Sequence, residues 1–498
     1  MIKHYLGFLA RDTYSNNMLK KYFNNILRNR KLSLFLIVIL GLVLRLIFFS
    51  GMGVSDDLAY SRYAKSIGKG IDPSSTLTLS TRLGLIYPTA LSYSLFGVND
   101  LSSVLFVLIA SIGNIILIFY FGKLLFNEKV GLLGSFLTAI FPLEVVSATK
   151  LLSDVPSAFF MALGVYVFMH AEKKSKQMLQ YLISGILIGI SYLIRESALL
   201  IALFFIIYIL YKRRVKREYF AVPAGVLIVF AVEFLMLYKV TGDPFYRFTT
   251  VQNYLSDVYI KLDYFGRLSF PEGLLHYPYL ILTNSLISYF YIFIFLSIAY
   301  LLAARKREAY ALLFWFIPLL LYISFGSASF SKYLPFKADP RYLSVITLPG
   351  ILLLAHFLAE KRQIIMKVIM PAALAVLIIA SIGTIYSDKD RGLLKDLRGT
   401  YPFLAKLDKT VYMDKRSMQA LDYISGYKNY IKAEEYPEEM SNIRDSYIVV
   451  NKWMIRNLKE SNMKLEFPEE IDSPPKNWKI IKEIGKDNKN NIVVYYIQ

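Results

Sequence analysis

The sequence contains no cysteine among its 498 residues. The chain therefore forms no disulfide bond and no thiolate metal site, and cysteine usage says nothing about its redox compartment. Charged residues are scarce as well, at 19% of the chain against 55% hydrophobic residues. The net charge of +20 comes without a clustered Arg-rich segment or a nucleic-acid-binding motif, so nucleic acid is excluded as the partner. No internal repeat or low-complexity segment stands out either.

What the sequence has instead is a series of long apolar runs between Leu32 and Tyr386. A run of about 20 apolar residues can span a bilayer as a helix, so the series predicts a polytopic α-helical membrane protein. We expect eleven transmembrane helices, at Leu32–Ser50, Leu101–Phe121, Val130–Ser147, Val155–His170, Leu179–Ile194, Ser197–Tyr211, Phe220–Tyr238, Asn284–Ala304, Ala309–Phe325, Tyr342–Leu358 and Ile364–Tyr386.

Basic clusters between these runs predict the orientation, because Lys and Arg gather in cytoplasmic loops. The clusters lie at residues 173–176, 212–217, 305–307 and 361–367. The apolar stretch between the first two is broken once, at Arg195 and Glu196. Since both flanks are cytoplasmic, this stretch crosses twice and places Arg195 and Glu196 at an outer turn. The N-terminus is then cytoplasmic and the C-terminus extracytoplasmic, in a multi-pass protein of the cell membrane.

Three segments follow from this topology. Residues 1–31 have apolar residues at helical spacing beside Lys and Arg, which predicts a cytoplasmic basic amphipathic tail on the lipid bilayer rather than a cleavable signal peptide. Residues 32–386 form the transmembrane domain, with a first outer loop at 51–100 and a Tyr-rich loop at 239–283. Residues 387–498 are charged, with strand-like runs at Ser446–Val450 and Ile492–Ile497, and predict a small extracytoplasmic α/β domain.

Two adjacent carboxylates, Asp56 and Asp57, follow the first predicted helix by a few residues. An acid partly desolvated at the bilayer edge is a stronger base than one in bulk water, which suits proton removal beside a lipid-borne substrate. The alternative is that Ser55, Asp56 or Asp57 caps the short helix that follows. Only one residue can be the N-cap, so a second acid remains without a structural role.

Further ionisable residues are expected at the same outer face, and charges at membrane depth usually have functional partners. They are Lys150, Asp154, Arg195, Glu196, Lys332, Lys337, Asp339 and Arg341, with Arg45, Glu144 and Glu233 near the outer ends of apolar runs. Structural alternatives exist for several. Arg45 snorkels to the interface, Arg195 pairs with Glu196, Arg341 pairs with Asp339, and Asp154 begins a helix with Pro156 in its first turn.

The order of these motifs resembles the GT-C superfamily of membrane glycosyltransferases, most of all glycosyltransferase family 39, which includes protein O-mannosyltransferases and aminoarabinose transferases. VSDDLAYSRYAKSI resembles the family's "DE…Y…A" segment, and TKLLSDVPSAFF resembles its "R…LLD…FF" segment. TRLGLIYPTALSYSLFG, ISYLIRESALL and DPRYLSVITLPGILLLA resemble three further segments. The sequence departs from the pattern in Asp57 where the family has Glu, in Lys150 where it has Arg, and in Leu83-Gly84 where a Pro pair is common.

The resemblance implies a GT-C fold and transfer of a sugar, with inversion, from a polyprenyl-phosphate-linked donor to an acceptor outside the membrane. Asp56 and Asp57 are then the catalytic residues, and the substrate-binding residues are Lys150, Asp154, Arg195, Glu196, Lys332, Arg341 and Tyr342. A divalent cation on Asp56, Asp57 and Asp154 stays open, and no other cofactor is implied. The acceptor, whether protein, lipid or glycan, also stays open. The alternatives are a polysaccharide polymerase or ligase, and a transporter, although transporters tend to show inverted repeats.

Overall fold

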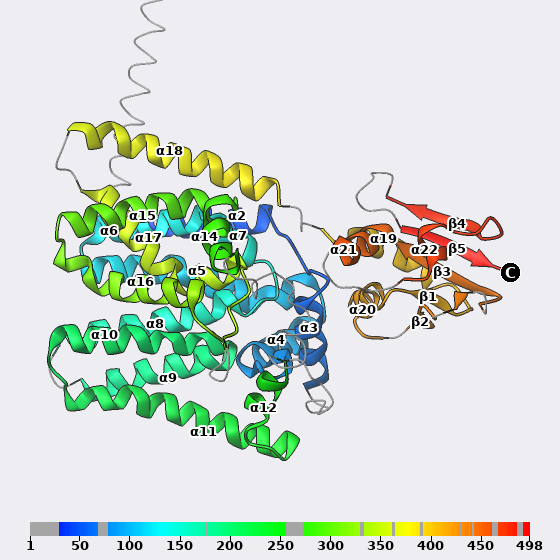
Figure 1. Ribbon diagram of the computed structural model, residues 1–498, viewed down its shortest axis with the longest axis horizontal. Coiled ribbons are helices and arrows are strands. Elements are labelled where there is room, and N and C mark those ends of the chain that lie inside the picture. The colour runs from blue at the N-terminus through cyan, green and yellow to red at the C-terminus, as the bar shows by residue number, and fades with distance from the viewer. Residues whose placement is uncertain are drawn as a thin grey trace, which may run out of the picture.

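The structure is a computed structural model, which describes residues 29–67, 78–174, 177–254, 272–328, 333–360, 364–388, 392–428, 430–437, 439–440, 443–460, 467–485 and 492–498. A bundle of helices is joined at one end to a small domain with a β-sheet (Figure 1). Most of the predicted N-terminal tail lies outside the described residues. The first described helix, α2 (Arg30–Ile47), is capped by Asn29, whose side chain accepts the N–H of Leu32.

A helix covers each of the eleven predicted crossings. After α2 these are α5 (Asp100–Leu125), α6 (Glu128–Ile140) with α7 (Pro142–Ser147), α8 (Asp154–Glu172), α9 (Met178–Ile194), η3 (Glu196–Ile201) with α10 (Ala202–Lys212), η4 (Arg217–Phe220) with α11 (Ala221–Thr241), α15 (Ser288–Ala303), η6 (Arg307–Ala309) with α16 (Tyr310–Phe325), η7 (Pro340–Leu343) with α17 (Ser344–Ala359), and α18 (Ile364–Tyr386). Within the described part of the chain, five helical stretches are long and apolar enough to cross a membrane by length and composition. The number eleven therefore stays a prediction.

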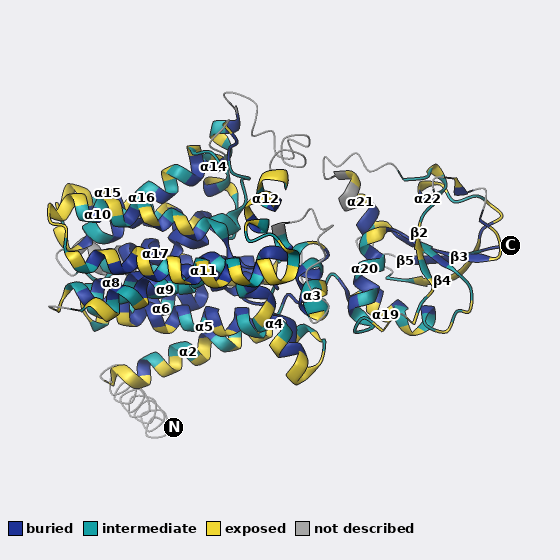
Figure 2. Ribbon diagram, turned by 90° about the horizontal axis from the view of Figure 1, so that it is seen from below, coloured by how far each residue is buried: buried dark blue, intermediate teal, exposed yellow. Residues whose placement is uncertain are grey.

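The outward surface of the bundle is apolar. Large hydrophobic side chains such as Phe35 and Ile47 on α2, and Leu227 and Leu235 on α11, are exposed. Figure 2 shows exposed residues along the outer faces of these helices, while buried residues concentrate between the helices. Such a surface suits lipid rather than water as its surroundings.

The third predicted crossing is broken. Helix α6 ends at Ile140 and α7 begins at Pro142, because proline lacks a backbone N–H and its ring cannot continue a helix, although it is well suited to a first turn. Every residue of α7 is buried. The break places α7 and the turn before α8 at the end of the bundle that adjoins the C-terminal domain. We call this the pocket end, and the opposite end, where α8 finishes, the far end.

The outer loops contain short helices. The first loop holds α3 (Asp56–Ser66), η2 (Thr78–Thr81) and α4 (Leu83–Phe96), and α4, with 14 residues, is too short to cross. Residues 239–283 were predicted to be a loop, but the structure has two helices there, α12 (Tyr246–Asn253) and α14 (Glu272–Thr283). Helix α14 is bent by 100° from α15 and packs against α15 and α16.

The C-terminal domain is an α/β unit, as expected. Its elements are α19 (Lys395–Leu404), β1 (Val411–Met413), α20 (Lys415–Ile424), β2 (Ala433–Glu435), β3 (Ser446–Asn451), α21 (Lys452–Glu460), α22 (Glu469–Asp472), β4 (Lys479–Ile484) and β5 (Ile492–Ile497). The strand order is β2-β1-β3-β5-β4. Strand β1 is parallel to β2 and β3, and the other pairs are antiparallel, with Val449 opposite Val494. Both strands predicted from the sequence, β3 and β5, are present and adjacent.

This domain shares an apolar core with the first outer loop. Leu58 and Tyr60 of α3 belong to one buried cluster with Leu421 of α20 and Met454 of α21. A chain of hydroxyl groups crosses the same interface: the Tyr427 hydroxyl lies 2.8 Å from Ser61 Oγ, and hydrogen bonds continue from there through Tyr93 and Ser103 to Tyr423. The domain is therefore packed directly against the helix that begins with Asp56 and Asp57.

Candidate active site

A cavity of about 620 Å³ lies at the pocket end, between the membrane helices and the C-terminal domain. It brings together most of the site residues predicted from the sequence, which are Asp56, Asp57, Lys150, Asp154, Arg195, Arg341 and Tyr342. Glu196 is absent from the lining and contacts the site through an arginine described below. Lys332 lies outside the described residues. Residues separated by nearly 300 positions thus surround one space.

Asp56 and Asp57 are the first two residues of α3 and have different surroundings. Ser55 occupies the N-cap position and its side chain makes no capping hydrogen bond, so capping accounts for neither carboxylate. Asp56 faces the cavity, its side chain is 34% exposed, and its Oδ2 lies 3.4 Å from Arg341 Nη1. Asp57 is buried, and its Oδ2 accepts the backbone N–H groups of Gly53 at 3.2 Å and Leu151 at 3.3 Å. Asp57 therefore ties together the two loops that carry Asp56 and Asp154.

The electrostatic state of Asp57 follows from this burial. Desolvation raises the pKa of its carboxyl to about 6, against the opposing effects of the Gly53 hydrogen bond and the charge of Lys150. A carboxyl with a pKa near 6 is mostly ionised at pH 7 and gains a proton in mild acid. Mild acid therefore neutralises the Asp57 carboxyl in the folded protein.

Arg195 does not pair with Glu196, which corrects one structural alternative. Its backbone is extended, with φ −157° and ψ 132°, and consecutive side chains of an extended segment point to opposite sides. Arg195 therefore reaches Asp154, with which it forms a buried ion pair, and its guanidinium lies 4.5 Å from the ring centroid of Tyr342. Helix α8 begins at Asp154, as expected, and Asp154 Oδ2 is buried with no hydrogen-bond partner among the described residues.

Arg341 contacts two carboxylates. Its Nη2 lies 3.1 Å from Asp339 Oδ2, which is the expected structural pair, and its Nη1 reaches Asp56. Lys337 Nζ lies 3.7 Å from the same Asp339 oxygen. Burial alone would raise the pKa of Asp339, but Arg341 and Lys337 together hold it below its usual value. Arg341 is thus oriented by Asp339 toward the carboxylate proposed to act in catalysis.

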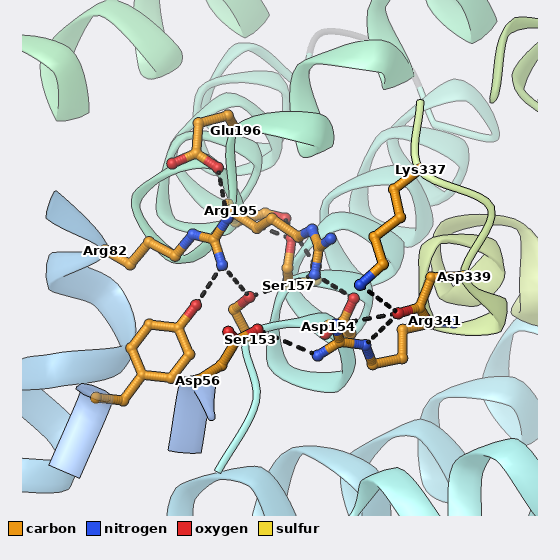
Figure 3. A network of polar contacts seen from close by, with 12 residues as sticks. Asp56, Arg82, Ser153, Asp154, Ser157, Arg195, Glu196, Lys337, Asp339 and Arg341 are labelled. Atoms are coloured by element: carbon orange, nitrogen blue, oxygen red, sulfur yellow. Dashed lines mark hydrogen bonds and ion pairs between the residues drawn. The ribbon is translucent and has the colours of Figure 1, made fainter. Parts of the chain in front are cut away.

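Sequence reasoning missed Arg82, a third arginine that lines the cavity. It precedes α4 and donates hydrogen bonds to the Tyr60 hydroxyl, to Ser153 Oγ at 3.1 Å and to Glu196 Oε2 at 3.3 Å (Figure 3). Its Nε is buried without a partner among the described residues. The signal was present, because Arg82 stands inside the family-like segment TRLGLIYPTALSYSLFG.

Arg247 of α12 was missed as well. It is fully buried, and its guanidinium binds Glu233 Oε1 at 2.6 Å and Glu196 Oε1 at 2.8 Å. Glu196 therefore bridges Arg247 and Arg82, and these two arginines lower its pKa to about 2 although burial alone would raise it. Glu233 could have pointed to Arg247, because an isolated acid in an apolar run requires a cationic partner.

Arg45 does not snorkel to the interface. It is fully buried, with Nε donating to Ser111 Oγ at 2.9 Å and Nη1 donating to the carbonyls of Gly41 and Ala139. Ala139 belongs to the last turn of α6, where backbone carbonyls have no partner within the helix. The proline break after α6 thus creates an acceptor inside the bundle, and Arg45 satisfies it together with Ser111, which also bonds Glu144.

A divalent cation does not fit the three acids considered for it. Among the described residues no three His, Asp or Glu side chains group as metal ligands. Asp154 is paired with Arg195, Asp56 with Arg341, and the Oδ2 of Asp57 accepts two backbone N–H groups.

Comparison with known proteins identifies the class of fold. Residues 83–238, from α4 into α11, match the family model described as dolichyl-phosphate-mannose-protein mannosyltransferase. The chain matches no curated protein sequence at a significant level. Among solved structures, ArnT from Cupriavidus metallidurans in the apo state is similar with a TM-score of 0.59 and 13% identity, over 92% of this chain and 97% of that one.

Two ligand-bound structures are similar as well. ArnT from Cupriavidus metallidurans bound to undecaprenyl phosphate gives a TM-score of 0.57 at 12% identity, covering 92% of this chain and 97% of that one. The oligosaccharyltransferase AglB from Archaeoglobus fulgidus, in complex with an inhibitory peptide and a dolichol-phosphate, gives 0.56 at 13% identity, covering 89% and 71%.

This chain is a multi-pass membrane protein with the GT-C fold. The predicted resemblance to the GT-C superfamily is confirmed for the fold and, over residues 83–238, by the match to the mannosyltransferase family model. Among the charged residues of the cavity, Lys150, Asp154 and Arg195 lie within the segment that matches the family model.

Proposed function

We propose that this protein is a glycosyltransferase that moves a sugar from a polyprenyl-phosphate-linked donor to an acceptor hydroxyl. The observation that carries the proposal is the convergence of Asp56, Arg82, Arg195 and Arg341 on one cavity at the end of a GT-C bundle. The similar structures support the donor class, since ArnT is bound to undecaprenyl phosphate and AglB is in complex with a dolichol-phosphate. The family match to protein mannosyltransferases supports the reaction class.

The reaction needs one displacement. The acceptor oxygen attacks the anomeric carbon opposite the phosphate, the bond from that carbon to the phosphate oxygen breaks, and polyprenyl phosphate leaves with the electron pair. Asp56 takes the hydroxyl proton as general base, because it is the partly exposed carboxylate that faces the cavity. A single displacement inverts the configuration of the sugar. Asp57 acts as a positioning residue through its bonds to Gly53 and Leu151.

The leaving phosphate is bound by the arginines. A guanidinium is planar, permanently charged and able to grip two phosphate oxygens. Each of the three arginines is held in place by a carboxylate: Arg82 by Glu196, Arg195 by Asp154 and Arg341 by Asp339. The clamp is therefore formed before the donor arrives. Lys150 supplies a weaker point charge at the edge, and Lys332 stays a candidate on its sequence position alone.

The proposed orientation places the cavity outside the cytoplasm. The basic segments at Lys212–Arg217 and Arg305–Arg307 lie at the far end, opposite the C-terminal domain (Figure 1), and such segments favour the cytoplasm. Single cysteines in this cysteine-free chain test the orientation. Lys476→Cys should react with a membrane-impermeant thiol reagent in intact cells, and Arg214→Cys should react only after permeabilisation. The reverse pattern would contradict the orientation.

A donor-turnover assay tests the function. The protein in lipid nanodiscs is supplied with a panel of polyprenyl-phosphate hexoses and pentoses, and released polyprenyl phosphate is measured. Asp56→Asn should lower turnover by about 10²-fold or more, the usual contribution of a general base, while Asn preserves the helix start. The matched control is Glu128→Gln at the start of α6, an exposed acid paired with Lys123 at the far end, which should leave turnover unchanged.

Two outcomes would overturn the proposal. Near-native turnover in Asp56→Asn would remove the catalytic assignment. Absence of turnover with every lipid-linked monosaccharide, together with turnover of lipid-linked oligosaccharides, would favour the polysaccharide polymerase or ligase. Movement of an intact lipid-linked sugar across the bilayer without its consumption would favour a transporter.

A further inference from the structure

The cavity has a second wall, which faces the acids and arginines described above. This wall comes from the C-terminal domain: Arg416 lies in the first turn of α20, and Trp453 and Met454 lie in the first turn of α21. None of the site residues predicted from the sequence belongs to it. The proposed donor clamp and base are supplied by the membrane domain, so the chemistry of the second wall has a separate purpose.

The position of this wall is fixed relative to Asp56. Helix α20 packs against α3, and Tyr427, just after α20, lies 2.8 Å from Ser61 of α3. The Tyr423 hydroxyl donates to Asp100 Oδ1 at 2.8 Å, and Arg398 pairs with the same carboxylate. The backbone N–H of Gly392 donates to the carbonyl of Ser50 at 3.1 Å. These contacts hold Arg416 and Trp453 over the catalytic helix instead of leaving the domain tethered by a linker.

The two polar residues of the wall have complementary chemistry. Trp453 packs one part of its side chain against the shared apolar core and lines the cavity with another. An indole face binds the apolar C–H face of a sugar ring and adds a polar N–H at its edge. Arg416 offers the planar fork that suits a carboxylate or phosphate. The two groups are on neighbouring elements of one surface.

We propose that Arg416 and Trp453 form the acceptor subsite, and that the acceptor is an anionic saccharide, a sugar ring that carries a phosphate or a carboxylate. The inference rests on the proposed glycosyltransferase function and names its acceptor class. Charge supports it, because the described lining holds six cationic side chains (Arg82, Lys150, Arg195, Lys337, Arg341, Arg416) against four acids (Asp56, Asp57, Asp154, Asp339). A cationic excess on two walls suits two anionic ligands, a donor phosphodiester on one side and an anionic acceptor on the other.

The binding of small anionic sugars tests the subsite directly. The donor clamp is first filled with an excess of polyprenyl phosphate, and the protein is then titrated with glucose 6-phosphate, glucuronate and glucose. Tryptophan fluorescence is the readout, since Trp453 lines the cavity while Trp315 and Trp478 are buried in the cores of the bundle and of the C-terminal domain. Both anionic sugars should quench the fluorescence in a saturable way, and glucose should bind at least about tenfold more weakly, because it lacks a charge-assisted bond.

Variants identify the residues responsible. Arg416→Gln should weaken the binding of both anionic sugars about tenfold or more and leave the binding of polyprenyl phosphate unchanged. Its matched control is Lys415→Gln, the preceding residue, which is exposed, pairs with Glu435 at 3.4 Å and does not line the cavity. Trp453→Phe should abolish the fluorescence change while calorimetry still detects weakened binding. Melting temperatures of all variants are compared with wild type to exclude misfolding.

Three results would overturn the inference. Equal binding of anionic sugars to wild type and Arg416→Gln would remove Arg416 from the subsite. Loss of binding when polyprenyl phosphate is present would show that the sugars occupy only the donor clamp. Quenching by a Ser/Thr-rich hexapeptide and not by the sugars would make the acceptor a peptide. Because polyprenyl-phosphate binding and donor turnover are measured separately, a failure here is distinguishable from a failure of the proposed function.

Discussion

Helix α8 has a carboxylate at each of its ends, and the two carboxylates differ in their hydrogen-bond partners and in whether they face the cavity. Asp154, the first residue, binds Arg195, lines the cavity and keeps one oxygen without a partner among the described residues. Glu172, the last residue, accepts hydrogen bonds from the hydroxyls of Tyr181 and Tyr208. It also forms an ion pair with Lys216, whose Nζ lies 2.7 Å from Glu172 Oε1. Glu172 is not among the residues that line the cavity.

The difference between Asp154 and Glu172 suggests how a charge that stabilises the fold can be told from a charge that serves function. At the far end, Phe168 and Tyr219 pack around the Glu172 cluster, and the hydrogen bonds there join α8, α9 and α10. At the pocket end, Asp154 Oδ2 and Arg82 Nε have unmet hydrogen-bonding capacity beside an open volume. Buried polar groups are normally satisfied, and these two unpartnered atoms belong to residues that line the cavity proposed to bind the donor. A charge at the end of an apolar helix is therefore informative only when it faces a cavity.

Among the variants that compare the two ends, the largest effect is expected at the pocket end, for Arg341→Lys. The substitution keeps the charge and removes the fork that grips two phosphate oxygens. Loss of one charge-assisted hydrogen bond corresponds to about 1.5–3 kcal/mol, so we expect kcat/KM for the polyprenyl-phosphate sugar to fall about 10–100-fold. The measurement is steady-state donor turnover in nanodiscs, with kcat and KM determined separately.

Asp339→Asn is the control for Arg341→Lys, because Asp339 holds Arg341 at 3.1 Å and is not expected to bind donor itself. If Arg341 only stabilises the fold, both variants should show equal losses of turnover and equal decreases in melting temperature. A selective loss of turnover in Arg341→Lys, with its melting temperature unchanged, supports the clamp.

The sequence was sufficient for features whose cause is local. Apolar length predicted the helices, alternation and turn residues predicted β3 and β5, and the motif around Asp56 singled out two acids that line the cavity. Glu196 could also be placed at a turn from the break in hydropathy. Each of these features depends on residues that are close together in the chain. Helical periodicity, strand alternation and the effect of proline on a helix are all local in this sense.

The sequence was insufficient for the partners of buried charges. A pair between Arg195 and its neighbour Glu196 was the structural alternative, but an extended backbone turns these side chains apart. The real partners of Glu196 are Arg82 and Arg247, 114 and 51 positions away. Arg45 was expected to snorkel to the interface, but it donates to the carbonyl of Ala139 inside the bundle. This acceptor is free only because α6 ends at Ile140 beside α2, which the sequence around Arg45 does not reveal. Such pairings depend on packing between distant elements, which no local pattern encodes.

A second prediction tests the burial of Asp57 at the pocket end through pH. Its pKa is raised from 3.8 to about 6 in the folded protein, so folding favours the protonated form. The stability that this protonation contributes is present below pH 4 and is lost as the pH rises through 6. Asp57→Asn does not titrate. We therefore expect the free energy of unfolding of wild type, relative to Asp57→Asn, to fall by about 2 kcal/mol between pH 4 and pH 7.

The free energies for this test come from denaturant unfolding in detergent at a series of pH values. Subtraction of the Asp57→Asn curve removes the contributions of the other carboxyls, such as Asp339 and Glu196, whose pKa values are lowered and whose effects on stability have the opposite sign. A difference curve that is flat across pH 4–7 would contradict the burial of an ionisable Asp57.

The smallest expected effect on turnover belongs to the far end and is tested by Lys216→Met. Lys216 pairs with Glu172, and their side chains are 25% and 10% exposed. The methionine keeps much of the aliphatic length and removes the charge, which leaves Glu172 with its tyrosine hydrogen bonds. Loss of one charge-assisted hydrogen bond should lower the free energy of unfolding by about 1.5–3 kcal/mol, while donor turnover below the melting temperature stays within about twofold of wild type.

Arg195→Met, which removes the corresponding cation at the other end of α8, is the comparison, and it should reduce both stability and turnover. Differential scanning measurements and the nanodisc turnover assay are made on the same preparations. Equal losses of turnover in the two variants would mean that the far end of α8 also takes part in the reaction, and the distinction between its two ends would then be wrong.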